Sequence, residues 1–157
     1  MPQGVRILVV DDDENIRRTL GVLLRQSGYS VDTAGSGEEA IAKSDASFYN
    51  LALIDVRLPD IEGTELLSRL KETTPRMMKV ILTGYPILES AIQAINRGVD
   101  GYLSKPVSTE HLLRTVSLLL DRQARERVFA EERLQHYIET RFTSGREVGS
   151  ELTEEVA

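Results

Sequence analysis

The chain has 157 residues, of which 41% are hydrophobic and 28% charged, a composition typical of a globular protein with one core. The absence of cysteine excludes disulfides and thiolate chemistry, and a net charge of −6 without a lysine and arginine cluster argues against direct nucleic-acid contact. No apolar stretch approaches the roughly 20 residues of a membrane helix, and the start of the chain lacks a signal-peptide pattern. We therefore expect a cytoplasmic protein with no membrane contact.

The sequence of residues 5–46 predicts two units, each a strand followed by a helix. Residues 5–10 are apolar at most positions, as expected of a strand covered on both faces. Asp13 can cap the helix that follows, and Gly28 stands where that helix must stop. An alternating strand is expected at residues 29–34, and a capping-box sequence opens a second helix over residues 36–46.

Three further units are expected in the second half of the domain. Each combines a short apolar strand with turn-forming residues and then apolar residues at helical spacing. The strands span residues 51–55, 78–83 and 101–105, and the helices carry the apolar residues at 66–70, 88–95 and 112–120. The sequence therefore predicts an α/β domain over residues 1–120, with a doubly wound, five-stranded parallel sheet.

The character of the chain changes after residue 120. Residues 121–142 keep a helical pattern but carry oppositely charged pairs four residues apart, such as Arg127 with Glu131, and their apolar positions form an irregular heptad. This pattern predicts a C-terminal helical extension and leaves two interpretations open: a solvated linker, or a homodimer formed through residues 108–142. Residues 143–157, with two glycines and an acidic end, predict a disordered tail.

Polar side chains follow four of the five strands at their carboxyl ends. Asp11 and Asp12 follow the first strand, Asp55 closes the third, Thr83 closes the fourth and Lys105 closes the fifth. In a sheet of order 2-1-3-4-5 these ends border one crevice. Three carboxylates in one hollow require a proton or a cation, and Mg²⁺, or Mn²⁺ in its place, suits such ligands. An aspartate can also attack phosphorus. Asp55 is the best candidate nucleophile, because it is the single aspartate that closes its strand and is expected to stand at the mouth of this crevice.

These residues stand in four short motifs. They are Leu8–Asp12, Asp55 with the Leu58-Pro59 pair and Gly63, Thr83-Gly84, and Tyr102–Pro106. In this order and spacing the motifs resemble the signature of the CheY-like receiver domain of two-component response regulators. The resemblance covers residues 5 to about 120 and implies a flavodoxin-like fold.

The same resemblance implies how the acidic residues act. Asp55 matches the phosphoacceptor aspartate of the family. Asp12 matches the acidic residue that binds Mg²⁺ directly, and Asp11 the one that binds it mainly through water. The backbone carbonyl of Arg57 matches a further ligand.

Three other residues match the family's phosphoryl-binding and switch positions. Thr83 matches the hydroxyl that reaches the phosphoryl group, Lys105 its ion partner and Tyr102 the aromatic switch, and the Lys105–Pro106 peptide is expected to be cis. The implied partners are a sensor histidine kinase and, through the face of the fourth helix, fifth strand and last helix, a downstream protein or a second copy. The chain would be a signalling domain that catalyses only its own phosphoryl transfer and dephosphorylation.

Three alternatives are weighed against this interpretation. The Asp11–Asp13 run also resembles the nucleophile motif of haloacid-dehalogenase-type phosphatases, with Asp11 as nucleophile and Asp13 as its helper, but that assignment leaves Asp55 unexplained. A receiver-like scaffold that is never phosphorylated would usually lack one of the key residues, all of which are present here. The chain is also consistent with the amino-terminal part of a longer regulator.

Overall fold

The computed structural model describes residues 4–84 and 98–156, with side chains described up to Arg141. The helix expected over residues 88–95 lies outside these ranges, and so does its share of the expected partner-binding face. The chain divides into two units, residues 1–123 and 124–157. Within the two described ranges, no helix combines the length and the apolar character that a membrane span needs.

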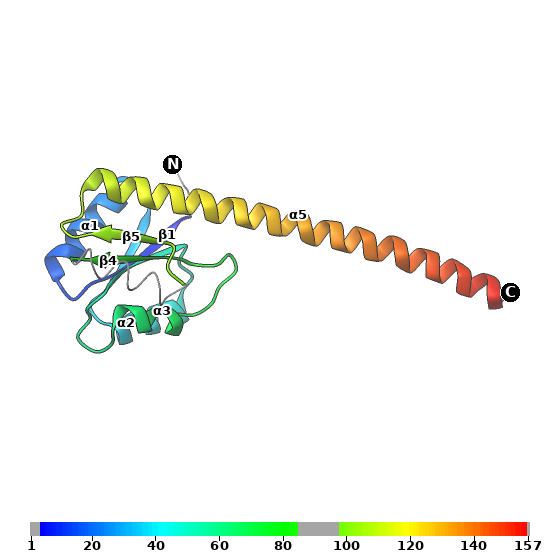
Figure 1. Ribbon diagram of the computed structural model, residues 1–157, viewed down its shortest axis with the longest axis horizontal. Coiled ribbons are helices and arrows are strands. Elements are labelled where there is room, and N and C mark those ends of the chain that lie inside the picture. The colour runs from blue at the N-terminus through cyan, green and yellow to red at the C-terminus, as the bar shows by residue number, and fades with distance from the viewer. Residues whose placement is uncertain (1–3, 85–97, 157) are drawn as a thin grey trace. The chain divides into compact units, whose positions relative to one another are not determined.

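The first unit is built on one parallel sheet with the strand order β2-β1-β3-β4-β5 (Figure 1). This order confirms the expected doubly wound topology, and the strand ends agree with the predicted ones to within a residue. The strands are β1 (Arg6–Val10), β2 (Ser30–Ala34), β3 (Leu51–Asp55), β4 (Met78–Thr83) and β5 (Gly101–Ser104).

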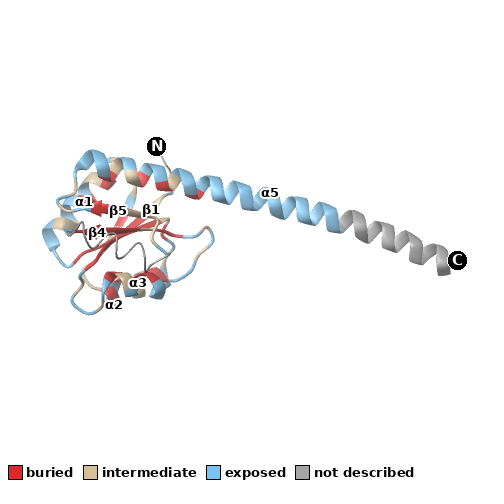
Figure 2. Ribbon diagram, in the orientation of Figure 1, coloured by how far each residue is buried: buried red, intermediate tan, exposed pale blue. Residues whose placement is uncertain are grey.

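Helices cover both faces of the sheet. The described helices are α1 (Glu14–Gln26), α2 (Gly37–Ala46), α3 (Gly63–Arg69) and α5 (Thr109–Val156). One core cluster joins the sheet to α1 and the first turns of α5, and a second joins it to α2 and α3. Figure 2 shows the strands as buried between these layers. Burial on both faces explains why the strands are almost continuously apolar in sequence.

The predicted helix caps are present. Asp13 Oδ1 accepts hydrogen bonds from the backbone N–H groups of Asn15 and Ile16 at the start of α1. Ser36 Oγ accepts from the N–H of Glu39, as a capping box requires, but the Glu39 carboxylate returns to the N–H of Gly35 rather than to that of Ser36. These caps fix where α1 and α2 begin.

A buried amide anchors α5 to the segments at the amino ends of β3 and β4. Gln123 is only 4% exposed, and its Nε2 donates to the carbonyl oxygens of Asn50 and Arg76, both at 2.8 Å. The Asn50 amide donates in turn to Gln123 Oε1 at 3.1 Å. Because these bonds tie the helix to the segments that precede β3 and β4, the first unit extends to Gln123 rather than ending at residue 120.

The structure differs from the sequence prediction in the last segment. The prediction was a disordered tail over residues 143–157, whereas α5 continues to Val156. Gly145 and Gly149 each make a helix less stable by about 1 kcal/mol relative to alanine. Unlike proline, however, glycine has a backbone N–H group that can donate the helical hydrogen bond. Since Pro106 is the last proline of the chain, no residue beyond it removes a helical donor.

Candidate functional site

The candidate site lies at the carboxyl ends of β1, β3 and β5. Side chains alternate between the faces of a strand, and Val9, Leu53 and Leu103 all belong to the core cluster on the side of α1 and α5. Asp11, Asp55 and Lys105 each follow one of these residues at a two-residue step. The alternation therefore directs the two carboxylates and the amine to the same side of the sheet.

The amine of Lys105 joins the two buried carboxylates. Its Nζ lies 2.8 Å from Asp11 Oδ2 and 3.3 Å from Asp55 Oδ2. Asp11 is fully buried and Asp55 is 8% exposed. The expectation that remote strand ends converge on one crevice is confirmed, and the closer partner of Lys105 is Asp11.

A third carboxylate completes an acidic cluster. Asp11, Asp12 and Asp55 can each offer an oxygen such that the three atoms lie within 4.8 Å of one another, and Asp12 is the exposed member. Carboxylate oxygens at this spacing are hard ligands, which suit a hard divalent cation. The residues present therefore fit a metal ion.

Backbone donors hold the other oxygens of the two buried carboxylates. Asp11 Oδ1 accepts from the N–H of Asp13 at 2.9 Å, and Asp55 Oδ1 accepts from the N–H of Arg57 at 3.4 Å. Each carboxylate thus presents one oxygen to its own loop and the other to Lys105. The contribution of the Asp13 N–H was not predicted, because the roles that the sequence suggests for Asp13, a helix cap or the helper of a phosphatase nucleophile, both involve its side chain.

The charges in this crevice do not balance. Burial and the charge of Asp11 raise the pKa of the Asp55 carboxyl, against the opposing effect of Lys105 and of the Arg57 N–H. For Lys105, burial alone would lower the pKa of the ammonium, but its hydrogen bond and ion pair with Asp11, together with the charge of Asp55, raise it. The lysine stays charged, and it relieves the repulsion between the carboxylates only in part.

The two residues expected to act as a switch, Thr83 and Tyr102, belong to β4 and β5. Thr83 ends β4 and is 1% exposed, and its carbonyl oxygen accepts from the N–H of Lys105 at 2.7 Å. Tyr102 on β5 is half-buried and packs against the core cluster on the side of α2 and α3. The Lys105–Pro106 peptide is cis, as the resemblance implies.

The loop after Asp55 folds back onto the strand that carries it. The N–H of Gly63 donates to the carbonyl of Val56 at 2.8 Å, and a Cβ on Gly63 would lie 2.2 Å from the carbonyl oxygen of Asp55. Only glycine fits this contact. The sequence motif includes Gly63, but its spacing alone does not reveal that the residue packs against the Asp55 backbone.

We predict that Asp55→Asn stabilises the metal-free protein at neutral pH, by on the order of 1 kcal/mol. Because the pKa of Asp55 is raised in the folded state, ionisation of this carboxyl disfavours folding. The penalty is absent at about pH 3, below the ordinary pKa of aspartate, and develops as the pH rises through the folded-state pKa. Urea unfolding in EDTA at several pH values measures this difference.

The matched control is Asp121→Asn on the exposed surface of α5, which should change the free energy of unfolding by no more than about 0.5 kcal/mol at any pH. A lower stability for Asp55→Asn than for wild type at pH 7 would contradict the charge imbalance described here.

Comparison with known proteins agrees with this geometry. The family model for the response regulator receiver domain matches residues 7–117. The transcriptional regulatory protein ResD of Bacillus subtilis is 36% identical over 126 residues, which are 79% of this chain and 51% of that protein. The alginate biosynthesis transcriptional regulatory protein AlgB of Pseudomonas syringae is 37% identical over 128 residues, covering 81% of this chain and 29% of AlgB.

Solved structures show the same fold. The crystal structure of a CheY-like response regulator receiver domain protein from Methanospirillum hungatei matches with a TM-score of 0.71 and 43% identity, over 78% of this chain and 98% of that chain. The present chain spans about half, or less, of the length of the curated relatives it matches. Because the family model covers most of the first unit and the acidic crevice lies where the motifs predict it, the chain belongs to the receiver domain family of two-component response regulators.

Proposed function

We propose that the chain accepts a phosphoryl group on Asp55 from a sensor histidine kinase, in the presence of Mg²⁺, and thereby changes its binding to a partner. The observation that carries this proposal is the single crevice in which Lys105 Nζ lies 2.8 Å from Asp11 and 3.3 Å from Asp55. Receiver domains pair with sensor kinases and output domains in two-component systems, which supports the assignment of the phosphoryl donor.

The proposed reaction is a displacement at phosphorus. A carboxylate oxygen of Asp55 forms a bond to phosphorus while the phosphorus–nitrogen bond of the phosphohistidine breaks, and the electron pair leaves with the imidazole. Lys105 supplies a fixed positive charge 3.3 Å from the attacking carboxylate. Hydrolysis of the resulting acyl phosphate by water returns the Asp55 carboxylate and inorganic phosphate.

The proposed metal is Mg²⁺, with Mn²⁺ as the alternative. Asp12 and Asp55 would bind it directly, Asp11 mainly through water, and the backbone carbonyl of Arg57 would complete the protein ligands. The different roles of the acidic pair are supported by burial, because Asp11 is held by Lys105 and by the Asp13 N–H while Asp12 is exposed. When bound, the ion neutralises charge on the phosphoryl oxygens.

The geometry favours Asp55 over Asp11 as the nucleophile. In the phosphatase alternative Asp11 attacks and Asp13 assists, but Asp11 is fully buried and paired with Lys105 at 2.8 Å. The Asp13 carboxylate is engaged in capping α1. These contacts support the proposal that Asp55, rather than Asp11, is the nucleophile.

The proposed output is a shift between two states of the partner-binding face. Thr83 would bond the phosphoryl oxygens, and Tyr102 would change its packing against the core cluster on the side of α2 and α3, which it contacts here. Such a shift needs only that the phosphorylated site favours one arrangement over the other. The partner is a downstream protein or a second copy of the chain.

For the second copy, the proposed contact is the exposed part of the helix within residues 108–142. Large apolar side chains there are more than half exposed: Leu118, Val128, Phe129, Leu134, Tyr137 and Ile138. Leu134 and Ile138 lie four residues apart, so they share one face, and Glu131 and Arg141 supply opposite charges close to them. A stripe of this kind can pair with the same stripe of another copy.

We predict that acetyl phosphate with Mg²⁺ labels the wild-type protein with one phosphoryl group and that Asp55→Asn is not labelled. Asp13→Asn, which retains an oxygen for the α1 cap, should label within about twofold of wild type. Intact-protein mass spectrometry measures both results. Labelling of Asp55→Asn, or loss of labelling in Asp13→Asn with a native fold, would instead favour the phosphatase assignment.

We also predict that the protein forms a dimer whose affinity increases on phosphorylation. Leu134→Glu combined with Ile138→Glu should weaken the dimer at least tenfold, because charges would then lie within the apolar stripe. Gln135→Glu, an exposed change on the same helix, is the control and should leave the affinity within about twofold. Light scattering over a concentration series gives the result, and a wild-type protein that remains monomeric with and without phosphodonor would refute the dimer.

A further inference from the structure

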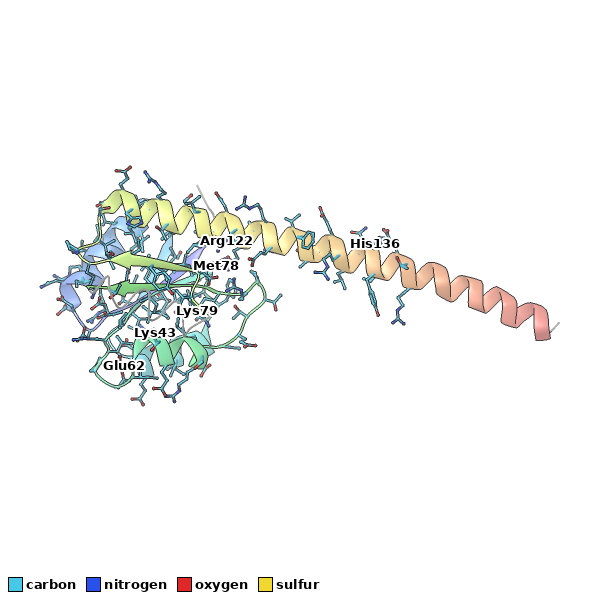
Figure 3. All side chains as sticks on the ribbon, viewed as in Figure 1. Lys43, Glu62, Met78, Lys79, Arg122 and His136 are labelled. Carbon is cyan, nitrogen blue, oxygen red and sulfur yellow. The ribbon has the colours of Figure 1, made fainter. Side chains whose placement is uncertain are left out.

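The loop between β3 and α3 carries Arg57 and is closed at its base. Arg57 and Glu62 form an antiparallel bridge, and the N–H of Gly63 donates to the carbonyl of Val56. Figure 3 marks Glu62, which closes the loop just before α3. The contact of Gly63 with the Asp55 backbone, described above, fixes this base against the strand.

The tip of the same loop is attached to a different helix. Asp60 Oδ1 accepts from the N–H of Gly37 at 2.9 Å, and Asp60 Oδ2 accepts from the N–H of Glu38 at 2.8 Å. These are the first two residues of α2, whose N–H groups have no acceptor within the helix. The side chain of Ser36, the N-cap of α2, accepts from the N–H of Glu39, and its backbone carbonyl accepts from the N–H of Ala40. Asp60 therefore completes the cap of a helix that precedes it by more than 20 residues.

The side chain of Ile61, at the loop tip, packs against the backbone of Gly37 too closely for a side chain on residue 37 to fit between them. A Cβ on Gly37 would lie 1.9 Å from Cγ2 of Ile61, the residue after Asp60. Glycine at the first position of α2 thus allows the loop tip to rest on the helix. The two hydrogen bonds and this close contact hold the tip at one place.

We propose that Asp60 is a positioning residue for phosphoryl transfer: by fixing the loop tip to α2, it holds the backbone of Arg57 in place beside Asp55. This inference rests on the proposed function of Asp55. Arg57 contributes two backbone groups, an N–H that donates to Asp55 Oδ1 and a carbonyl that would bind the metal. With the base and the tip both attached, the short stretch that contains Arg57 has little freedom to move.

A carboxylate suits this position better than other capping groups. Its two oxygens accept from two adjacent N–H groups at once, whereas an asparagine at this position has one acceptor oxygen. Its negative charge is also favoured at the amino end of a helix. The hydrogen bonds from the N–H groups of Glu38 and Gly37 lower the pKa of the Asp60 carboxyl, so this carboxylate stays ionised at neutral pH.

The test measures the initial rate of labelling by acetyl phosphate as a function of Mg²⁺ concentration, on the full chain. Asp60→Ala should raise the Mg²⁺ concentration for half-maximal rate by about tenfold, as loss of a residue that orients a ligand typically does. At saturating Mg²⁺ the rate should return to within about threefold of wild type. Asp60→Asn should recover part of the loss, since it can keep one of the two bonds.

Ser36→Ala is the matched control, because it removes a side-chain cap of the same helix that bonds to Glu39, within α2, rather than to the loop. Its Mg²⁺ dependence should equal that of wild type, and circular dichroism should show native helix content in every variant. An Asp60→Ala curve equal to wild type, or equal to a shifted Ser36→Ala curve, would overturn the proposal. Absence of label on Asp55 in the wild-type protein would instead overturn the proposed function.

Discussion

One ammonium shared by two buried carboxylates is the interaction on which this site depends. Lys105 reaches Asp11 and Asp55 from a different strand, so the contact exists only when β1, β3 and β5 present their carboxyl ends to the same crevice. A single positive charge cannot balance two carboxylates, and Asp12 adds a third at the mouth. Burial and the charge of Asp11 raise the pKa of Asp55, and the remaining negative charge explains the fit of the crevice to a divalent cation.

The rest of the fold can be understood as the support for this unfavourable cluster. Strands that are buried on both faces give the three side chains a rigid base, and backbone N–H groups fix the oxygens that do not face Lys105. The loop after Asp55 is attached at its base by Gly63 and at its tip by Asp60. Packing and hydrogen bonds thus hold the carboxylates close together against their mutual repulsion. Such an arrangement is common where the needs of function reduce the stability of the fold.

The sequence predicts the strands and the polar residues that close them because each depends on a local pattern, whereas the strand order is an expectation that goes with the flavodoxin-like fold implied by the resemblance. Asp55 and Lys105 are each visible as a polar residue that closes an apolar strand, and the topology of parallel sheets then brings them together. Asp60 and Gln123 are not predictable in this way, because their partners lie more than 20 residues away along the chain and no local pattern pairs them. The tail prediction failed for a different reason: composition favoured disorder over residues 143–157, but no residue there prevents the backbone of α5 from continuing.

The central claim is that the crevice carries an excess of negative charge that a divalent cation relieves, and thermal unfolding with and without Mg²⁺ tests it most directly. At a concentration about 100 times its dissociation constant, a bound ion should stabilise the folded protein by about 2.7 kcal/mol. The account predicts a clear rise in the unfolding temperature with Mg²⁺ and a much smaller rise for Asp12→Asn. An unfolding temperature that does not respond to Mg²⁺, or an equal response in Asp12→Asn, would contradict it.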